Sequence, residues 1–558
     1  MDLNIYIYFS FYFIILFSVV GYGLFFSHIT NVLSISQNFG YAGLLGLFFL
    51  TIYSYISNFF FAHSLIHNSL LILLGIFFYL YFVRNNFYKR KEILFFILIF
   101  LVFFISVLIF KTHDDFPYYH FAYSYYLTQS PSHIGIGAFN HGFKTPSSIF
   151  YLNSLFYLPI VKYYMFHMPA LLIMGFSNII FLNKIIKNIK NKSVNFLTFF
   201  TLLSFLFVNI FFYRVGEHGT DRSAQILVFI LLIEILLLIN FPVDKYTQIT
   251  KIYMLMGLII SFKAFYTLYL LFFIPVFFFY YEKNNLFSVF RIIQNKFFVF
   301  FLFLMILLGV SNFFNTGCLL YPVNITCFES LKWSFDSQHI THMNNWYEQW
   351  SKAGAGPNFR VVNPLEYIAH FNWVPNWIEI YFFNKVSDFL GGSLFLSLVV
   401  VLIFYSKIKI QIGSYKILLT YLILLSLFVE WFYNHPSLRY GGYCLLATLI
   451  FLPISVLLEK NFNIEDKNLK NKFFFLIMCG LLIFLGRNLI RIDREYKQYG
   501  YKPIKEVFYH IDEGHFIVQK EFDKLISNFN TCKIKDNECL KLKPEIIKSY
   551  GKYIFINN

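Results

Sequence analysis

Two adjacent aspartates, Asp114 and Asp115, open the first long polar segment of the sequence. Pro117 follows them, and since proline suits the first turn of a helix, either aspartate could cap a helix that runs to about Gln129. The alternative role is chemical, because ionisable groups at the edge of the hydrocarbon are costly to place and usually functional. A carboxylate there could take a proton from an incoming hydroxyl group, as a general base does.

Other polar side chains accompany this aspartate pair. On a helix that begins near Phe116, Tyr119 lies one turn from Asp115 and shares its face, with His120 beside them. Farther along, His141 and Lys144 stand among glycines that allow tight backbone turns, and both are available to meet an anion. Nothing in this segment resembles a nucleotide-binding P-loop, so the sequence does not support direct use of ATP.

A second polar segment contains charges of both signs within nine residues, from Arg214 to Arg222. Asp221 could simply cap the helix that follows, but the density of charge favours a site. Glu217 and His218, together with Asp221, could hold a divalent metal such as Mg²⁺ or Mn²⁺. Ligands scattered over one loop are, however, a weak signal for a metal.

Isolated basic residues occur farther along the chain. Lys263 interrupts an apolar stretch, and Arg439 follows another, a few residues after His435. A lone basic side chain can snorkel to the lipid headgroups. Basic groups supplied by several loops could equally clamp a phosphate, for which the arginine fork is well suited.

Long apolar runs must position these groups. The chain has 558 residues, of which 58% are hydrophobic and 13% charged, against roughly 45–50% and about 25% in soluble domains. Runs of roughly 17 or more apolar residues are long enough to cross a bilayer, and lipid requires them to be helical. Examples are Tyr6–Phe25, Ile93–Phe110, Val194–Tyr213, Ile226–Val243 and Ile417–Tyr433. We therefore predict an all-α polytopic membrane protein with about 13–14 transmembrane helices.

Basic clusters between the apolar runs predict the topology. By the positive-inside rule the following loops are cytoplasmic: Arg84–Glu92, Lys184–Lys192, Asp244–Lys251, Glu282–Lys296, Lys407–Lys416 and Lys460–Lys472. They alternate with segments predicted to be extracytoplasmic, provided that Ile252–Tyr281 crosses twice with a turn near Lys263. The amino terminus is then outside. The same clusters explain the net charge of +16, so we reject nucleic-acid binding.

The extracytoplasmic segments include two large loops, residues 112–148 and 312–388, and a tail. We predict a transmembrane domain over residues 1–486 and a small extracytoplasmic domain over residues 487–558. The tryptophans of the second loop suggest packing on the membrane surface. Two cysteine pairs in these outer segments predict disulfides in an oxidising compartment, namely Cys318 with Cys327 and Cys532 with Cys539.

These motifs carry a resemblance. An acidic residue that opens the first large outer loop, on a chain of this length and orientation, resembles the GT-C superfamily of membrane glycosyltransferases, which use polyprenyl-phosphate-linked sugars. More closely, the chain looks like a group of uncharacterised bacterial GT-C-like membrane proteins. The motifs are Asp115 with Tyr119 and His120, the run Gly135–Phe143, the run Gly317–Pro322 that contains Tyr321, the run Pro436–Tyr440, and the cysteine-bearing tail.

The resemblance implies a GT-C-like helix bundle and an inverting sugar transfer on the outer face of a bacterial cytoplasmic (inner) membrane. Asp115 takes the position of the catalytic base, and Asp114 or Asp221 assists. The donor is a polyprenyl-phosphate sugar, and the acceptor is a glycan or lipid of the cell envelope. No cofactor is implied beyond the divalent metal considered above. The groups expected to stabilise the departing phosphate or to bind substrate are Arg439, Lys263, Arg222, His141, Tyr119, His120, Tyr321 and His435.

Two other functions remain open. An O-antigen polymerase or ligase would depend on basic residues of the second large loop, which are Lys332, His339, His342 and Arg360. A lipid or glycan transporter without enzymatic activity would show ionisable residues at mid-membrane and repeated halves. The sequence places only Glu234 deep in a helix and contains no clear repeat.

Overall fold

The computed structural model describes residues 5–85, 90–281, 286–354, 361–406, 415–463, 466–535 and 544–557. Within these ranges, ten helical segments are long and apolar enough to cross a membrane. The uninterrupted ones are α1 (Ile5–Ile29), α3 (Phe39–Phe60), α4 (Leu65–Arg84), α11 (Asp221–Asn240), α15 (Lys296–Thr316) and α22 (Leu469–Tyr499). The chain is thus a mostly helical, multi-pass membrane protein, which confirms the prediction at this level.

The other four spans each join two or three helical pieces. They are Tyr163–Lys190, which ends in α9 (Met168–Lys190); Ala264–Tyr281, made of η6 (Ala264–Phe272) and α13 (Phe273–Tyr281); Val374–Phe404, made of α18 (Val374–Trp377), η8 (Ile378–Val386) and α19 (Ser387–Phe404); and Leu438–Lys460, made of η9 (Leu438–Gly442) and α21 (Tyr443–Lys460). Interruptions of this kind are tolerated where neighbouring helices bury the irregular backbone.

Four further helices account for the difference between these ten spans and the 13–14 predicted. They are α5 (Arg90–Phe104), α10 (Phe196–Phe211), α12 (Lys245–Phe262) and α20 (Leu418–Asn434). Three of them have 15, 16 and 17 residues, which is at or below the length that crosses roughly 30 Å of hydrocarbon. The fourth, α12, has 18 residues but a polar first turn.

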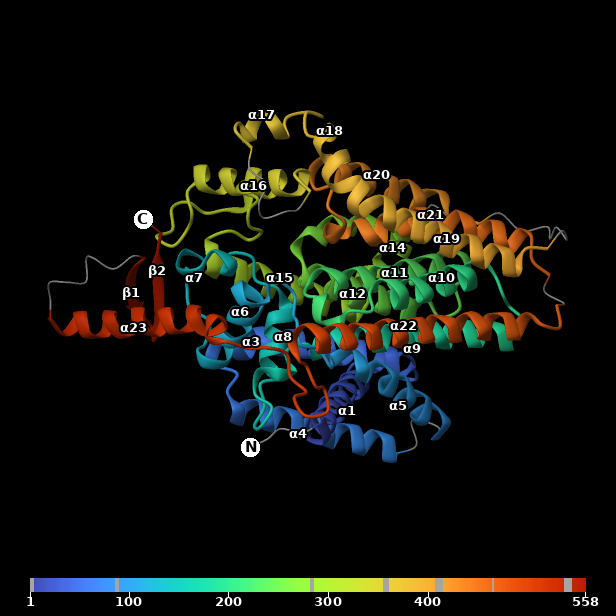
Figure 1. Cartoon of the computed structure of the whole chain (residues 1–558), viewed down its shortest axis with the longest axis horizontal. Coiled ribbons are helices and arrows are strands. Elements are labelled where there is room, and N and C mark those ends of the chain that lie inside the picture. The colour runs from blue at the N-terminus through green and yellow to red at the C-terminus, as the bar shows by residue number, and fades with distance from the viewer. Residues whose placement is uncertain are drawn as a thin grey trace.

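The polar segments gather at one end of the bundle, which we call the loop end. Figure 1 shows the long helices α10, α11, α12 and α22 running side by side, with α6 (Phe121–Gln129), α7 (Ile136–Phe139) and α16 (Ser337–Lys352) near their left-hand ends. The remaining short elements are α2 (Leu33–Ser36), η1 (Ile105–Val107), η2 (Phe116–His120), η3 (His141–Phe143), α8 (Ser148–Leu155), η4 (Tyr163–Met165), η5 (Val215–Glu217), α14 (Leu286–Ile293), η7 (Asn324–Thr326) and α17 (Pro364–Ile368).

A charged group buried within the bundle joins four helices. Glu234 on α11 is fully buried, and its carboxylate lies 2.6 Å from Lys184 Nζ on α9 and 3.9 Å from Lys251 Nζ on α12. The Tyr41 hydroxyl on α3 donates a hydrogen bond to the same carboxylate. Glu234, which the transporter hypothesis would use, is therefore committed to an ion-pair network that ties these helices together.

The tail returns to the first polar segment. Helix α22 continues through the predicted boundary at residue 487 and is followed by η10 (Glu513–Phe516) and α23 (Ile517–Lys535). Strands β1 (Glu545–Ser549) and β2 (Lys552–Ile556) then form an antiparallel hairpin that was not predicted. Ile134 bridges to Ile554 in parallel, with its N–H 3.0 Å from the Tyr553 carbonyl oxygen. The tail thus pairs with a loop some 400 residues earlier in the chain.

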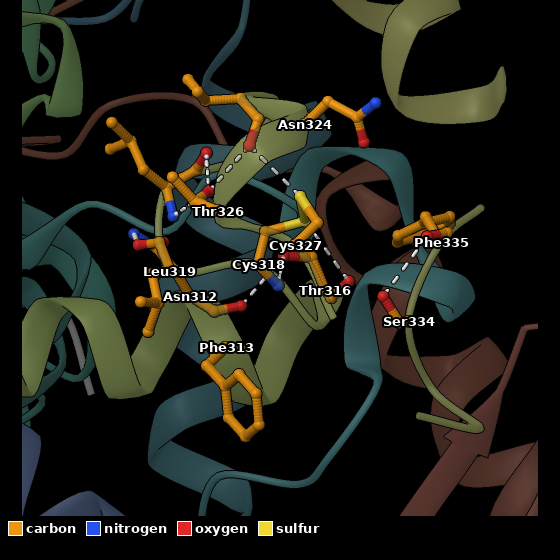
Figure 2. Close-up of a disulfide and its surroundings, with 12 residues drawn as sticks. Asn312, Phe313, Thr316, Cys318, Leu319, Asn324, Thr326, Cys327, Ser334 and Phe335 are labelled. Atoms are coloured by element: carbon orange, nitrogen blue, oxygen red, sulfur yellow. Dashed lines mark hydrogen bonds between the residues drawn. A yellow bond between two sulfur atoms is a disulfide. The ribbon is translucent and has the colours of Figure 1, made fainter. Parts of the chain in front are cut away.

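A disulfide fixes the start of the second large loop. Cys318 and Cys327 are bonded, and Figure 2 shows them just beyond the end of α15, with Thr316 and Asn312 close by. The Asn312 amide donates to the Leu319 carbonyl oxygen at 3.1 Å, which holds this turn onto the helix. Cys539, half of the other expected pair, lies outside the described residues.

Candidate active site

Four charged side chains from four separate segments meet at the loop end. Arg439 places Nη2 2.9 Å from Asp115 Oδ2 and Nε 3.0 Å from Asp221 Oδ2. Lys263 Nζ donates to the other oxygen of Asp221. We call Asp115, Asp221, Lys263 and Arg439 the Asp–Arg cluster. It holds two negative and two positive charges, so the cluster is balanced in charge.

Each member of the cluster stands where a helix begins or ends. Asp115 precedes the π-helical turn η2, and Asp221 is the first residue of α11. Lys263 directly follows α12, which fits the predicted turn there, and Arg439 is in η9 beside Gly441 at φ +91°. Neither Asp115 nor Thr220, the two N-cap residues, makes a side-chain capping bond. The Asp115 carboxylate is therefore used for ion pairing rather than for capping.

Gln225 holds the Arg439 segment in place, and sequence reasoning missed it. Its amide nitrogen lies 3.3 Å from the Leu438 carbonyl oxygen and 3.1 Å from that of Arg439. Its amide oxygen accepts from the Cys444 N–H at 3.0 Å. Gln225 is one turn after Asp221 on α11, so a single helix positions both a carboxylate of the cluster and the backbone that carries Arg439. A lone glutamine in an apolar run gives no distinguishing signal.

Tyr119 and His113 surround the Asp115 carboxylate. The Tyr119 hydroxyl donates to Asp115 Oδ2 at 3.1 Å, as their spacing predicted, and His113 Nδ1 lies 3.6 Å from the same oxygen. Burial is the largest single effect on the Asp115 carboxyl and by itself would raise its pKa. The charge and hydrogen bond of Arg439, together with the two nearby histidines, outweigh burial and lower that pKa. Burial and Arg439 lower the pKa of His113, and burial lowers that of His120 to about 3. Both imidazoles are therefore neutral at pH 7.

The two neighbouring aspartates have different environments. The Asp114 side chain is 85% exposed and lies 3.2 Å from Lys111 Nζ, away from the cluster. The Asp115 side chain is 32% exposed and bound by Arg439. Asp115 is thus the member of the pair that belongs to the site.

Helix α16 lies against the cluster. The Trp350 ring is 5.4 Å from Arg439 Cζ, and its centroid is 5.9 Å from that of Tyr440, which in turn lies 4.3 Å from Lys263 Nζ. Trp377 donates its indole N–H to the Pro436 carbonyl oxygen at 2.9 Å and is buried. These two tryptophans therefore contact the protein around the Arg439 segment. Packing of the second loop on the membrane surface stays a prediction.

The residues considered for metal binding are engaged elsewhere. Glu217 lies 2.6 Å from Arg214 and 3.3 Å from Arg222. His218 Nε2 lies 2.6 Å from the Phe212 carbonyl oxygen, and burial lowers the pKa of this imidazole to about 3. Across the part of the chain that the structure describes, no group of three or more His, Cys, Asp or Glu residues is arranged to hold a metal ion. The donor set around Glu217 does not fit Mg²⁺ or Mn²⁺.

The other expected substrate-binding residues are distributed around the site. His435 borders the cluster, with its ring 6.0 Å from that of Tyr440. His120 stacks on His113 at 5.7 Å, whereas Arg222 is held by Glu217.

His141 and Tyr321 contact side chains outside the Asp–Arg cluster. The His141 ring is 6.0 Å from Trp346, and Tyr321 packs on Phe335 at 5.9 Å. Of the residues named for a polymerase, His339 bonds to Lys144, and Arg360 lies outside the described residues.

Comparison with known proteins gives one match. A family model described as "Domain of unknown function (DUF8201)" matches residues 5–446, well over half of the chain. The matched region contains all four residues of the Asp–Arg cluster and ends before α22. No curated protein and no solved structure matches.

Proposed function

The chain belongs to the DUF8201 family, and we propose that it is a GT-C-type glycosyltransferase. It transfers a sugar from a polyprenyl-phosphate donor to a glycan or lipid of the cell envelope, with inversion, on the outer face of a bacterial cytoplasmic membrane. The observation that carries the proposal is the bridge made by Arg439 between Asp115 and Asp221 at the loop end of the bundle. One guanidinium, one ammonium and one releasable carboxylate are the groups that such a transfer needs.

The carboxylates of Asp115 and Asp221 keep different partners when Arg439 turns toward a substrate. Asp221 keeps Lys263 as its partner. Asp115 keeps only the Tyr119 hydroxyl and the neutral His113. An incoming phosphate that competes for Arg439 would therefore free Asp115 and leave Asp221 neutralised. This asymmetry supports Asp115 as the base and Asp221 as an anchoring residue.

The chemistry then follows from these positions. Once Arg439 no longer compensates the charge, burial raises the pKa of Asp115, and the carboxylate becomes a stronger base. It takes the proton of the acceptor hydroxyl while the hydroxyl oxygen forms a bond to the anomeric carbon. The bond from that carbon to the phosphate oxygen breaks, and its electron pair leaves with the lipid phosphate. Arg439 and Lys263 stabilise the negative charge where it develops.

The position of the cluster suits a lipid-linked donor. Asp221 begins one helix and Lys263 follows another, which supports a site at the level where these helices leave the membrane. The basic loop between these two helices lies at the opposite end of both, which the positive-inside rule assigns to the cytoplasm. A donor carried by the membrane itself reaches such a site without a nucleotide.

The test compares two aspartate variants in the full-length protein. Mass spectrometry of lipid extracts from a deletion strain and its parent first identifies the accumulating donor, which is then labelled and reconstituted with the protein in liposomes. General-base catalysis contributes about 10²–10⁴-fold, so Asp115→Asn should lower the transfer rate at least about 100-fold. The matched control Asp114→Asn makes the same chemical change outside the cluster and should stay within about twofold of the wild type.

Two results would overturn the proposal. If Asp115→Asn keeps full activity while Arg360→Ala loses it, the polymerase hypothesis replaces the present one. If the protein, Asp115→Asn and Arg360→Ala all move a labelled lipid-linked sugar across the liposome membrane without transferring it to an acceptor, the protein is a transporter.

A further inference from the structure

A second positive group near the loop end lacks a counter-ion. Lys144 is 7% exposed, and its Nζ lies 2.9 Å from His339 Nε2 and 4.4 Å from the centre of the Phe335 ring. Among the residues that the structure describes, no carboxylate forms an ion pair with it. The Lys144 region thus differs from the Asp–Arg cluster, where each cation has an acidic partner.

The nearby acidic groups are already engaged. The Asp336 carboxylate caps α16 and accepts from the His339 N–H at 2.6 Å. Glu348 on the same helix lies 2.5 Å from Lys352 Nζ. Burial lowers the pKa of Lys144 to about 8, which reflects the cost of an uncompensated buried ammonium. An anion delivered to this ammonium would remove that cost.

Other hydrogen-bonding side chains lie near the Phe335 ring that Lys144 contacts. Tyr321 is 4% exposed, its ring packs on Phe335, and its hydroxyl has no partner. Burial and the charge of Lys144 lower the pKa of His141 and of His339. Both imidazoles would gain a proton more easily beside an anion. A lysine, an unsatisfied tyrosine hydroxyl and two histidines without an available carboxylate are the chemistry of a phosphate site.

Lys144 and the Asp–Arg cluster contact different turns of α16. His339, which contacts Lys144, and Trp350, which contacts Arg439, are both on α16. Their eleven-residue separation corresponds to about 16 Å along the helix axis. Because the donor phosphate is assigned to Arg439 and Lys263, an anion at Lys144 would come from the other substrate.

We propose that Lys144, His339 and Tyr321 form a second anion subsite that binds a phosphate group carried by the acceptor. This inference rests on the proposed function, which places the donor phosphate at Arg439 and Lys263. The acceptor is then a phosphate-bearing glycan or lipid, and α16 spans both substrates.

The first test needs no variant. The full-length protein is placed in nanodiscs of neutral phosphatidylcholine, and the acetylation rates of Lys144 and the exposed Lys332 are compared at pH 8 by peptide mass spectrometry. Inorganic phosphate in one arm, and phosphatidic acid added to the nanodisc in the other, distinguish a soluble from a lipid-borne phosphate. Either anion should favour the charged form of Lys144 and slow its acetylation severalfold, with Lys332 unchanged. Equal rates with and without both anions would rule out the subsite.

The second test measures affinity for inorganic phosphate or phosphatidic acid, whichever protects Lys144. Loss of a hydrogen bond to a charged group costs about 1.5–3 kcal/mol, so Lys144→Met should weaken binding about 10- to 150-fold. Lys332→Met should not change it, and Lys144→Arg should retain most of it. If Lys144→Met binds as tightly as the wild type while Arg439→Gln loses binding, the protein has one anion site and the inference is wrong. The proposed function is unaffected by that result, because it depends on the Asp115→Asn transfer assay.

Discussion

The ion pair between Asp115 and Arg439 should make a measurable contribution to stability. Removing one partner of a fully buried pair costs about 3–5 kcal/mol, whereas a fully exposed pair contributes about 0–1 kcal/mol. The side chains of Asp115 and Arg439 are 32% and 26% exposed, and Arg439 also binds Asp221. We therefore expect an intermediate coupling energy of about 2 kcal/mol, a factor of about 30 in the unfolding equilibrium.

A double-mutant cycle isolates this coupling. Asp115→Asn, Arg439→Gln and the double variant are unfolded at equilibrium in mixed SDS micelles, with helicity followed by circular dichroism. The matched cycle uses Asp114→Asn with Arg439→Gln, because Asp114 is exposed and faces Lys111. That second cycle should give a coupling below about 0.5 kcal/mol, as for independent sites. Equal couplings in the two cycles would refute the assigned ion pair.

The ion pair between Asp115 and Arg439 also predicts how the unfolding free energy depends on pH. The pKa of Asp115 in the folded protein lies below its ordinary value, so its stabilising contribution is complete above the unfolded pKa of about 3.9. The difference in unfolding free energy between wild type and Asp115→Asn should stay constant from about pH 7 to pH 5. It should shrink as the pH falls below about 4 toward the folded pKa. A difference that shrinks between pH 7 and 5 instead would mean that this pKa is raised.

Two further substitutions test how the bundle is held together. Glu234→Gln leaves Lys184 and Lys251 without their shared carboxylate. The unfolding free energy in detergent should therefore fall by about 3–5 kcal/mol. A fall below about 1 kcal/mol would show that these ion pairs do not hold the helices together. Arg491 donates to the carbonyl oxygens of Ile105 and Leu108 and to the Glu495 carboxylate, which accepts from the Phe110 N–H at 3.0 Å. Arg491→Met should therefore speed up hydrogen exchange of the Phe110 amide about 10- to 100-fold. An unchanged rate in exchange mass spectrometry would contradict this role.

The sequence predicted the membrane helices well because hydrocarbon imposes one local rule on every span. Apolar length alone located Tyr6–Phe25, which falls within α1, and Ile226–Val243, which overlaps α11 up to Asn240. The spacing of Asp115 and Tyr119 also sufficed, because four residues bring side chains together in any helical turn. Helix ends were less predictable. Helix α12 begins at Lys245, before the predicted apolar segment begins at Ile252, because neighbouring helices can cover a polar first turn.

The arrangement of the site depended on contacts between distant segments. Asp221, Lys263 and Arg439 were named separately, but nothing local indicated that Arg439 would bind both aspartates. Nor could a local pattern show which of Asp114 and Asp115 belongs to the site, since this depends on the side of the turn from which Arg439 approaches. The tryptophans of the second loop, Trp350 among them, predicted that this loop packs on the membrane surface, and nothing local indicated that Trp350 would contact Arg439. Its contact with Arg439 depends on the path of the whole second loop.

The bridge between Ile134 and Ile554 has a consequence for how the protein is made. A ribosome releases the partner of Ile134 only after more than 400 further residues have been synthesised. Throughout that interval the backbone of the first loop has one edge unpaired, while the helices on either side are already in the bilayer. The surface at the loop end is thus completed only once residues 552–556 have been made. A message cut short before codon 552 would yield an inserted bundle whose first loop is never paired.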